Sequence, residues 1–423
     1  MNTRKGRRPR PEDPDREGRL AREADPGRRR LVQGLFAAGC AACLAGTGNL
    51  SPVLAQDASV GPSLLKASRG ELPFHPARWW KDAGDLRVDC GLCPKKCRVA
   101  DVERGACGVR ENRGGKYYTR VYGRPCSLHI DPIEKKPLNH VLPGTQSFSL
   151  ATPGCNFECK FCQNWEIAQA RPEQVPTFEL SAEQVARLAA QYSTPTISCT
   201  YTEPVVYSEY VHDIAAAAKK SGIRTLIISN GYILEEPLRD LMEVLGGVKV
   251  DLKAYTEKFY RELCGGELKP VLETLRRLRK HGTWTEIVVL IVPTLNDGEE
   301  EIRGLARFVR GDLGPEVPVH FTRFHPQYRL QNLPRTPVAT LERAREIAMA
   351  EGLQFVYLGN VPGHPGNNTW CPRCQSLLIR RVGMSTQENR LKQGKCPKCG
   401  QAIPGIWSWR GPPKDPGSRP ANA

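Results

Sequence analysis

Three cysteines, Cys155, Cys159 and Cys162, carry the strongest chemical signal in this chain of 423 residues. They follow an apolar run at 148–152 that predicts a strand. A 4Fe-4S cluster normally takes four thiolates, so three thiolates leave one iron open to bind another molecule. A zinc site without its fourth ligand, or a set of buried structural cysteines, is the alternative. The spacing favours a cluster whose open iron takes part in catalysis.

Two further cysteine groups have metal-ligand spacing, in a chain with 16 cysteines in all. The C-terminal group is a paired CxxC pattern and predicts a structural zinc site closed by four thiolates. The N-terminal group offers four ligands for either zinc or a second iron–sulfur cluster, and its spacing does not decide between them. The C-terminal group is Cys371, Cys374, Cys396 and Cys399, and the N-terminal group is Cys90, Cys93, Cys97 and Cys107. The isolated Cys126, Cys199 and Cys264 are expected to be buried as small apolar residues.

The net charge of +16 is concentrated at the two ends of the chain. Residues 1–30 hold 11 Lys and Arg against 6 Asp and Glu, and residues 371–423 hold 10 against 2, which leaves +3 for the middle. A nearly neutral middle argues against an extended groove for a phosphate backbone. We therefore expect no nucleic-acid partner, and we expect a monomer.

The N-terminus has the pattern of an export signal. A run of arginines at Arg28, Arg29 and Arg30 precedes an apolar stretch from Leu31 to about Leu44, which predicts a twin-arginine leader over residues 1–55. The stretch is too short to predict a membrane span. We expect an exported protein, periplasmic or membrane-associated; an uncleaved anchor, or a leader-like sequence on a cytoplasmic protein, is the alternative.

From residue 147 the sequence alternates between apolar runs and amphipathic stretches. Continuous apolar runs are typical of strands buried on both faces of a parallel sheet. The pattern predicts an α/β fold of the partial (β/α)6-type barrel kind, with functional groups on the loops after the strands. The predicted strands are 148–152, 196–201, 224–230, 248–253, 284–292, 317–324 and 354–358, and the predicted helices are 181–192, 205–222, 237–245, 270–281, 299–312 and 337–352.

These elements suggest a division of the chain into segments. A linker at 56–84 leads to a cysteine-rich module at 85–145, and the core domain follows at 146–360. A zinc-ribbon-like module at 361–405 and a disordered tail at 406–423 complete the chain.

Polar side chains follow several predicted strands, where parallel strands bring them to one edge of the sheet. Thr202 and Glu203 follow the second strand, and the carboxylate suits the amino group of a bound amino-acid-like cofactor or, alternatively, caps the next helix. Asp251 and Lys253 are two residues apart on a strand and so share a face, as cofactor ligands or as a buried ion pair. Candidates for ribose or carboxylate contacts are Ser229, Asn230 and His325.

The chain from about 85 to 405 resembles the radical S-adenosylmethionine (SAM) protein of the AmmeMemoRadiSam system, a group related to pyruvate formate-lyase activating enzymes. The resemblance implies that Cys155, Cys159 and Cys162 bind the 4Fe-4S cluster. It also implies SAM contacts from the backbone near Phe161 and Gln163 and from Thr202, Glu203, Asp251, Lys253 and His325. The motifs that carry it are Cys90-Gly91-Leu92-Cys93-Pro94 and the blocks 105–110, 131–138, 154–165, 200–204 and 250–253.

The resemblance further implies reductive cleavage of SAM to a 5′-deoxyadenosyl radical that takes a hydrogen atom from an unidentified protein or metabolite. The expected partners are a low-potential donor of the flavodoxin or ferredoxin type and the other proteins of that system. Thr200-Tyr201-Thr202-Glu203 replaces the Gly-Gly-Glu run usual in glycyl-radical activating enzymes, which argues against the substrate of those enzymes. A glycyl-radical activating enzyme is therefore the alternative and not the first choice. A non-catalytic iron–sulfur and zinc scaffold is the alternative outside enzymes.

Overall fold

The computed structural model describes residues 71–409. The predicted leader at 1–55 and most of the linker lie outside the described residues. None of the helices in 71–409 is long and apolar enough to cross a bilayer.

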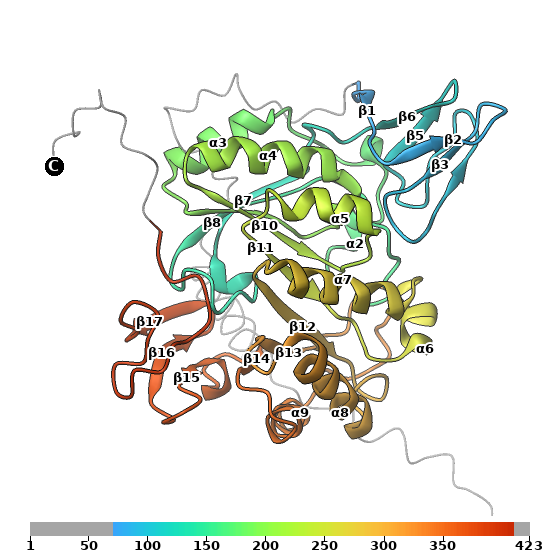
Figure 1. Ribbon diagram of the computed structural model, residues 1–423. Coiled ribbons are helices and arrows are strands. Elements are labelled where there is room, and N and C mark those ends of the chain that lie inside the picture. Colours follow the sequence, from blue (N-terminus) through green and yellow to red (C-terminus); the bar gives the residue numbers. More distant parts are fainter. Residues whose placement is uncertain (1–70, 410–423) are drawn as a thin grey trace, which may run out of the picture. The chain divides into compact units, whose positions relative to one another are not determined.

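The centre of the protein is an eight-stranded sheet in the order β14-β13-β12-β11-β10-β9-β8-β7. Strands β8 to β14 are parallel, as predicted, and β7 is added antiparallel to β8 (Figure 1). This order is that of an open sheet, with β14 and β7 as outer strands among the described residues. The bounds are β7 Ser127–Pro132, β8 Gln146–Ala151, β9 Thr196–Cys199, β10 Arg224–Ser229, β11 Gly247–Asp251, β12 Thr285–Ile291, β13 Val319–Arg323 and β14 Val356–Gly359.

Helices connect the parallel strands, and all six long helices predicted from the sequence are present. Ser181 begins one of them with a capping box: its hydroxyl accepts from the Gln184 amide, and the Gln184 side chain accepts from the Ser181 amide. Gly282 ends another with φ +81°. The bounds are α2 Trp165–Ala168, α3 Ala182–Gln191, α4 Ser208–Lys220, α5 Glu235–Met242, α6 Glu257–Phe259, α7 Leu268–His281, α8 Glu299–Phe308 and α9 Val338–Ala350.

The two faces of the sheet differ in chemistry. Residues paired across neighbouring strands share a face, so Phe148 and Ile197 lie on one side and Ser149 and Ser198 on the other. The first face is apolar and packs in the main hydrophobic core. The second face is polar, and its other members include Lys249, Glu286 and His320.

The N-terminal module consists of two three-stranded sheets, β1-β6-β5 and β2-β3-β4. The predicted linker extends too far, because part of it pairs in these sheets: β1 with β6, and β2 with β3. The strands are β1 His75–Pro76, β2 Trp80–Asp82, β3 Val88–Cys90, β4 Arg98–Val99, β5 Arg110–Arg113 and β6 Lys116–Thr119.

The C-terminal module is a third antiparallel sheet, β15-β16-β17, followed by a cysteine-bearing loop. The predicted disordered tail begins too early: Ile406 forms a bridge with Val141, and its amide donates to the His140 carbonyl at 2.7 Å. The rest of the tail, from 410, lies outside the described residues. The strands are β15 Thr369–Trp370, β16 Leu377–Val382 and β17 Ser385–Asn389.

Candidate active site

The loop that carries Cys155, Cys159 and Cys162 starts directly after β8 with Gly154, whose φ is +97°. A Cβ atom at this position would lie 2.5 Å from Val109 Cγ1 and 2.8 Å from the Cys107 carbonyl oxygen. Glycine is therefore required both by the backbone angle and by contact with the N-terminal module. The turn also donates from the Gly154 amide to the Ile167 carbonyl at 3.0 Å.

The middle of the loop is held against the π-helix at Tyr260–Cys264. The Glu158 amide donates to the Cys264 carbonyl, and the Lys160 amide donates to the Leu263 carbonyl, both at 2.9 Å. Cys264 lies beside Cys159, and a hydrogen bond between the two thiols lowers the pKa of Cys159. The expectation of a merely apolar Cys264 thus missed its contact with the loop, because the partner is about a hundred residues away in sequence.

Burial has the opposite effect on the other two thiols of the loop. It raises the pKa of Cys155 well above its ordinary value and that of Cys162 to about 11. The Phe157 amide donates to Cys155 Sγ at 3.4 Å, and the Asn230 side-chain amide faces the same sulfur at 4.0 Å. A cationic iron group would offset the desolvation of such thiolates, and the donors around Cys155 fit a sulfur ligand of this kind.

Glu203 lies at the centre of a hydrogen-bonded group formed by the ends of β9 and β10. Its Oε1 accepts from Ser229 Oγ at 2.7 Å and from the Val205 amide at 3.0 Å, and its Oε2 accepts from the Asn230 amide at 2.8 Å. Burial raises the pKa of this carboxyl to about 7. The predicted cap is present, because Glu203 caps the turn at Pro204–Tyr207, whereas the cofactor contact of Glu203 stays a prediction.

A second charged group, partly buried, lies on β11, the strand next to β10. Asp251 is bonded to two ammonium groups, that of Lys249 and that of Lys253, the latter at 3.0 Å. Burial opposes ionisation of Asp251, but the two lysines more than offset it and lower its pKa to about 2. The predicted pairing of Asp251 with Lys253 is therefore present, and Lys249 is a member that sequence reasoning missed.

The other predicted contacts are more scattered. Thr202 Oγ1 donates to the Thr152 carbonyl at 2.7 Å, which ties the end of β9 to the end of β8. Phe161 is buried against Phe259, whereas Gln163 is exposed and its carbonyl accepts from the Gln327 side chain at 3.4 Å. His325 follows β13 but is exposed.

The segment 131–138, whose role the sequence left open, adds buried polar groups near this site. Asp131 accepts from Lys135 at 2.7 Å and from Lys136 at 2.5 Å, and the Tyr201 hydroxyl donates to it as well. Tyr201 directly precedes Thr202, has φ +64°, and its carbonyl accepts from the Asn164 side chain at 2.8 Å. The segment therefore lies beside Tyr201, which follows β9 and is itself bonded to Asn164.

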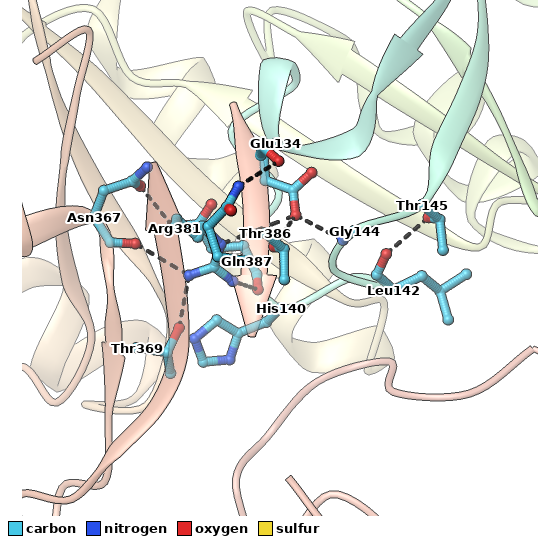
Figure 2. A network of polar contacts seen from close by, with 12 residues as sticks. Glu134, His140, Leu142, Gly144, Thr145, Asn367, Thr369, Arg381, Thr386 and Gln387 are labelled. Atoms are coloured by element: carbon cyan, nitrogen blue, oxygen red, sulfur yellow. Dashed lines mark hydrogen bonds and ion pairs between the residues drawn. The ribbon is translucent and has the colours of Figure 1, made fainter. Parts of the chain in front are cut away.

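The C-terminal module holds this segment in place through Arg381 (Figure 2). Its guanidinium is fully buried and donates to the Asn139 carbonyl at 2.7 Å and to Thr369 Oγ1 at 2.9 Å. Glu134 accepts from Thr386 Oγ1 at 2.6 Å and from the Gly144 amide at 2.7 Å. Two strands of the module thus contact the same segment.

The cysteines of this module lie close together. Cys371 and Cys399 have sulfur atoms 3.6 Å apart, and those of Cys374 and Cys396 are 3.7 Å apart. Tetrahedral zinc with bonds of about 2.3 Å places its sulfur ligands about 3.8 Å from one another. The geometry fits a single metal ion, and this is the one group within 71–409 whose three or more metal-ligating atoms lie within 4.8 Å of one another.

His140 makes the interface between the C-terminal module and the neighbouring core sensitive to acid. Its Nδ1 lies 2.6 Å from the Pro404 carbonyl and its Nε2 lies 2.6 Å from the Tyr357 hydroxyl. Burial lowers the pKa of His140 to about 4. Because the unfolded chain binds a proton near pH 6.5, the stability linked to this group is complete above that pH and is lost as the pH falls toward 4.

We expect this histidine alone to lower the free energy of unfolding by about 2 kcal/mol between pH 7 and pH 5. A His140→Gln variant should lack that share of the pH dependence. Denaturant titrations of both proteins at the two pH values measure it as a difference. Equal losses in the two proteins would contradict the assignment.

This chain is similar to several known proteins. A sequence profile of the Radical SAM superfamily matches residues 149–309. "Uncharacterized protein MJ0808" of Methanocaldococcus jannaschii is 45% identical over 329 residues, which are 77% of this chain and 98% of that protein. The pyruvate formate-lyase 1-activating enzyme of Escherichia coli (strain K12) is 25% identical over 221 residues, 48% of this chain and 89% of the enzyme. Among solved structures, Streptococcus suis SuiB bound to S-adenosylmethionine matches with a TM-score of 0.41 and 15% identity, over 54% of this chain and 53% of SuiB.

Proposed function

Because this chain belongs to the Radical SAM superfamily of enzymes, we propose that Cys155, Cys159 and Cys162 hold the 4Fe-4S cluster that this family uses with SAM. When bound, cluster and SAM supply the one-electron reductive cleavage that yields a 5′-deoxyadenosyl radical, which takes a hydrogen atom from the substrate. The observation that carries the proposal is the contact between the cysteine loop after β8 and the Glu203 group after β9 and β10.

The proposed SAM site extends along the ends of four neighbouring strands. Glu203 is the partner for the SAM ammonium group, because its buried carboxylate gains most from a positive charge. Lys253 is the partner for the SAM carboxylate and is already oriented by Asp251. The remaining proposed contacts are the backbone at Phe161 and Gln163 and the side chains of Thr202, Ser229, Asn230 and His325.

The substrate is proposed to lie beside Lys136 and Tyr201. Lys136 is buried, its Nζ lies 3.3 Å from the Tyr201 hydroxyl, and burial lowers the pKa of this lysine to about 8. The peptide that bears Tyr201 adjoins the proposed SAM contacts, but the side chain points to Asp131. These groups favour a polar substrate.

The sequence motifs support the finer proposal that the chain is the radical SAM component of the AmmeMemoRadiSam system, acting on a protein or metabolite. A glycyl-radical activating role is the alternative, supported by the likeness to the pyruvate formate-lyase 1-activating enzyme. A low-potential donor, zinc at Cys371, Cys374, Cys396 and Cys399, and export by the leader are further proposals.

The test is anaerobic incubation with SAM and dithionite, which should release 5′-deoxyadenosine. Glu203→Gln should raise the SAM concentration for half-maximal release about 10- to 100-fold, since a hydrogen bond to a charged group is worth about 1.5–3 kcal/mol. Lys136→Met, the matched change at the proposed substrate side, should leave that concentration unchanged. If Glu203→Gln and Lys136→Met changed this SAM concentration equally, the assignment of Glu203 to SAM and Lys136 to the substrate would be wrong. Reconstituted protein that forms no 5′-deoxyadenosine would contradict the proposed function.

A further inference from the structure

The four cysteines of the N-terminal module converge although they come from three separate turns. The Cys90 amide at the end of β3 donates to the Cys97 carbonyl at 2.9 Å, and the Lys96 amide closes a turn on the Cys93 carbonyl at 3.0 Å. Cys107 lies in the turn that the Gly108 amide closes on the Gly105 carbonyl at 2.9 Å. The four thiols lie near enough to act electrostatically on one another: Cys90 with Cys97, Cys93 with Cys90 and Cys107, and Cys107 with Cys97.

Each of these thiols has its own hydrogen-bond donors. Backbone amides of Leu92, Lys95 and Val109 donate to Cys90, Cys93 and Cys107, respectively. The Ala106 amide donates to Cys97 Sγ at 3.4 Å. Hydrogen bonds to the sulfur ligands are a general feature of iron–sulfur sites, where they help to set the potential.

Two buried polar side chains complete this surrounding. The Tyr117 hydroxyl is buried beside Cys90 and finds no nitrogen or oxygen partner in the described part of the chain. The Arg110 guanidinium is buried nearby and acts electrostatically on Cys90 and Cys107. The Tyr117 hydroxyl can donate to a sulfur atom of this group, while the Arg110 guanidinium next to it is itself paired with Glu209.

The group adjoins the loop of Cys155. Asn156 is hydrogen-bonded to Cys93 and accepts from the Asn230 side chain at 2.8 Å, and that same side chain faces Cys155 Sγ. The Cys107 carbonyl fills the space next to Gly154. Two amide side chains therefore connect a sulfur of one group with a sulfur of the other.

We propose that Cys90, Cys93, Cys97 and Cys107 hold a second iron–sulfur cluster that relays electrons to the cluster at Cys155, Cys159 and Cys162. Zinc has no redox chemistry, so a zinc ion at these four cysteines could not pass electrons to the neighbouring Cys155 loop. The C-terminal group, with its sulfur pairs at 3.6 and 3.7 Å, provides the contrasting geometry of a single-ion site. The metal site goes beyond the proposed function, whereas the relay of electrons rests on it.

The relay step transfers one electron at a time. A low-potential flavin or iron–sulfur protein reduces the second cluster by one electron, and that electron then passes to the cluster of the loop, so the second cluster returns to its oxidised state. Cys97 and Cys107 are partly exposed, and the neighbouring Lys96 and Arg98 are exposed. The second cluster would therefore lie near the surface, where a donor protein can approach it.

The site is tested by metal analysis of a variant in which Cys155, Cys159 and Cys162 are all changed to Ala. After anaerobic reconstitution it should keep about four irons and four sulfides per chain, against about eight of each in the unaltered protein. The same variant with Cys90→Ala and Cys93→Ala added should keep none. A triple variant without iron, or with a second equivalent of zinc, would overturn the proposal. Since no SAM is used, this result does not depend on the proposed function.

The relay is tested with Cys97→Ser/Cys107→Ser in the otherwise unaltered protein. Cleavage of SAM driven by dithionite, a small reductant, should persist, whereas cleavage driven by reduced flavodoxin should fall to background. A variant that responds alike to both reductants would exclude the relay. Zinc content serves as the folding control, because the C-terminal group is unchanged.

Discussion

A Cys159→Ala variant is expected to fold, to lose the iron of the loop cluster and to form no 5′-deoxyadenosine from SAM. Cys159 is buried, and the Cys264 thiol and the Lys253 ammonium group both favour its thiolate. With one of three thiolates removed, the cluster would have two unfilled irons, and the electronic properties that its ligands set would be lost. Iron analysis and chromatography of the reaction mixture measure the two effects.

Cys199→Ala is the matched control. Cys199 is also fully buried, but it lies on β9 with an apolar role, so this variant should keep both iron and activity. Reductive cleavage of SAM at the unaltered rate in Cys159→Ala would remove the assignment of the cluster to this loop.

Changing Arg110 to Met is expected to lower the free energy of unfolding by about 3–5 kcal/mol, the usual result of leaving one member of a buried ion pair alone. Arg110 Nη1 and Nη2 donate to the two oxygens of Glu209 at 2.9 and 2.8 Å, and both side chains are almost completely buried. The pair joins β5 of the N-terminal module to α4 of the core. Its loss leaves the Glu209 carboxylate without its main partner.

Anaerobic urea titrations followed by tryptophan fluorescence can measure this effect. The double variant Arg110→Met/Glu209→Gln should recover part of the loss, because the uncompensated charge is gone. Arg98→Met breaks an exposed ion pair with Asp89 in the same module and should leave the midpoint unchanged. Similar midpoints for the two single variants would show that burial of the Arg110 pair is not what stabilises the joint.

The parallel core could be predicted because its signals are local. Apolar runs indicated the strands from β8 to β14, and the predicted strand and helix ranges agree with the observed ones to within a few residues. The same locality placed Glu203 and Asp251 at strand ends. Their closeness to the cysteine loop follows from the parallel arrangement alone.

What could not be predicted depends on contacts between distant parts of the chain. The segment 131–138 is polar and gives no periodic signal, yet Asp131 and Lys136 are buried by Tyr201, about seventy residues later. In the sequence, Lys249 looks like any lysine on a strand, and only the structure shows its ion pair with Asp251. The short strands at 75–82 lack the alternation that marks a strand, because each pairs for only two or three residues.

The contacts of the C-terminal module with residues 134–144 have a consequence for how the protein is made. Arg381 and Ile406 contact Asn139 and Val141 across more than two hundred residues, so these contacts cannot form until nearly the whole chain has left the ribosome. Native contacts of such long range form late, and large chains pass through partly structured intermediates on the way. We therefore expect residues 134–144 of a newly synthesised chain to lack these native contacts until residues 369–406 have been made.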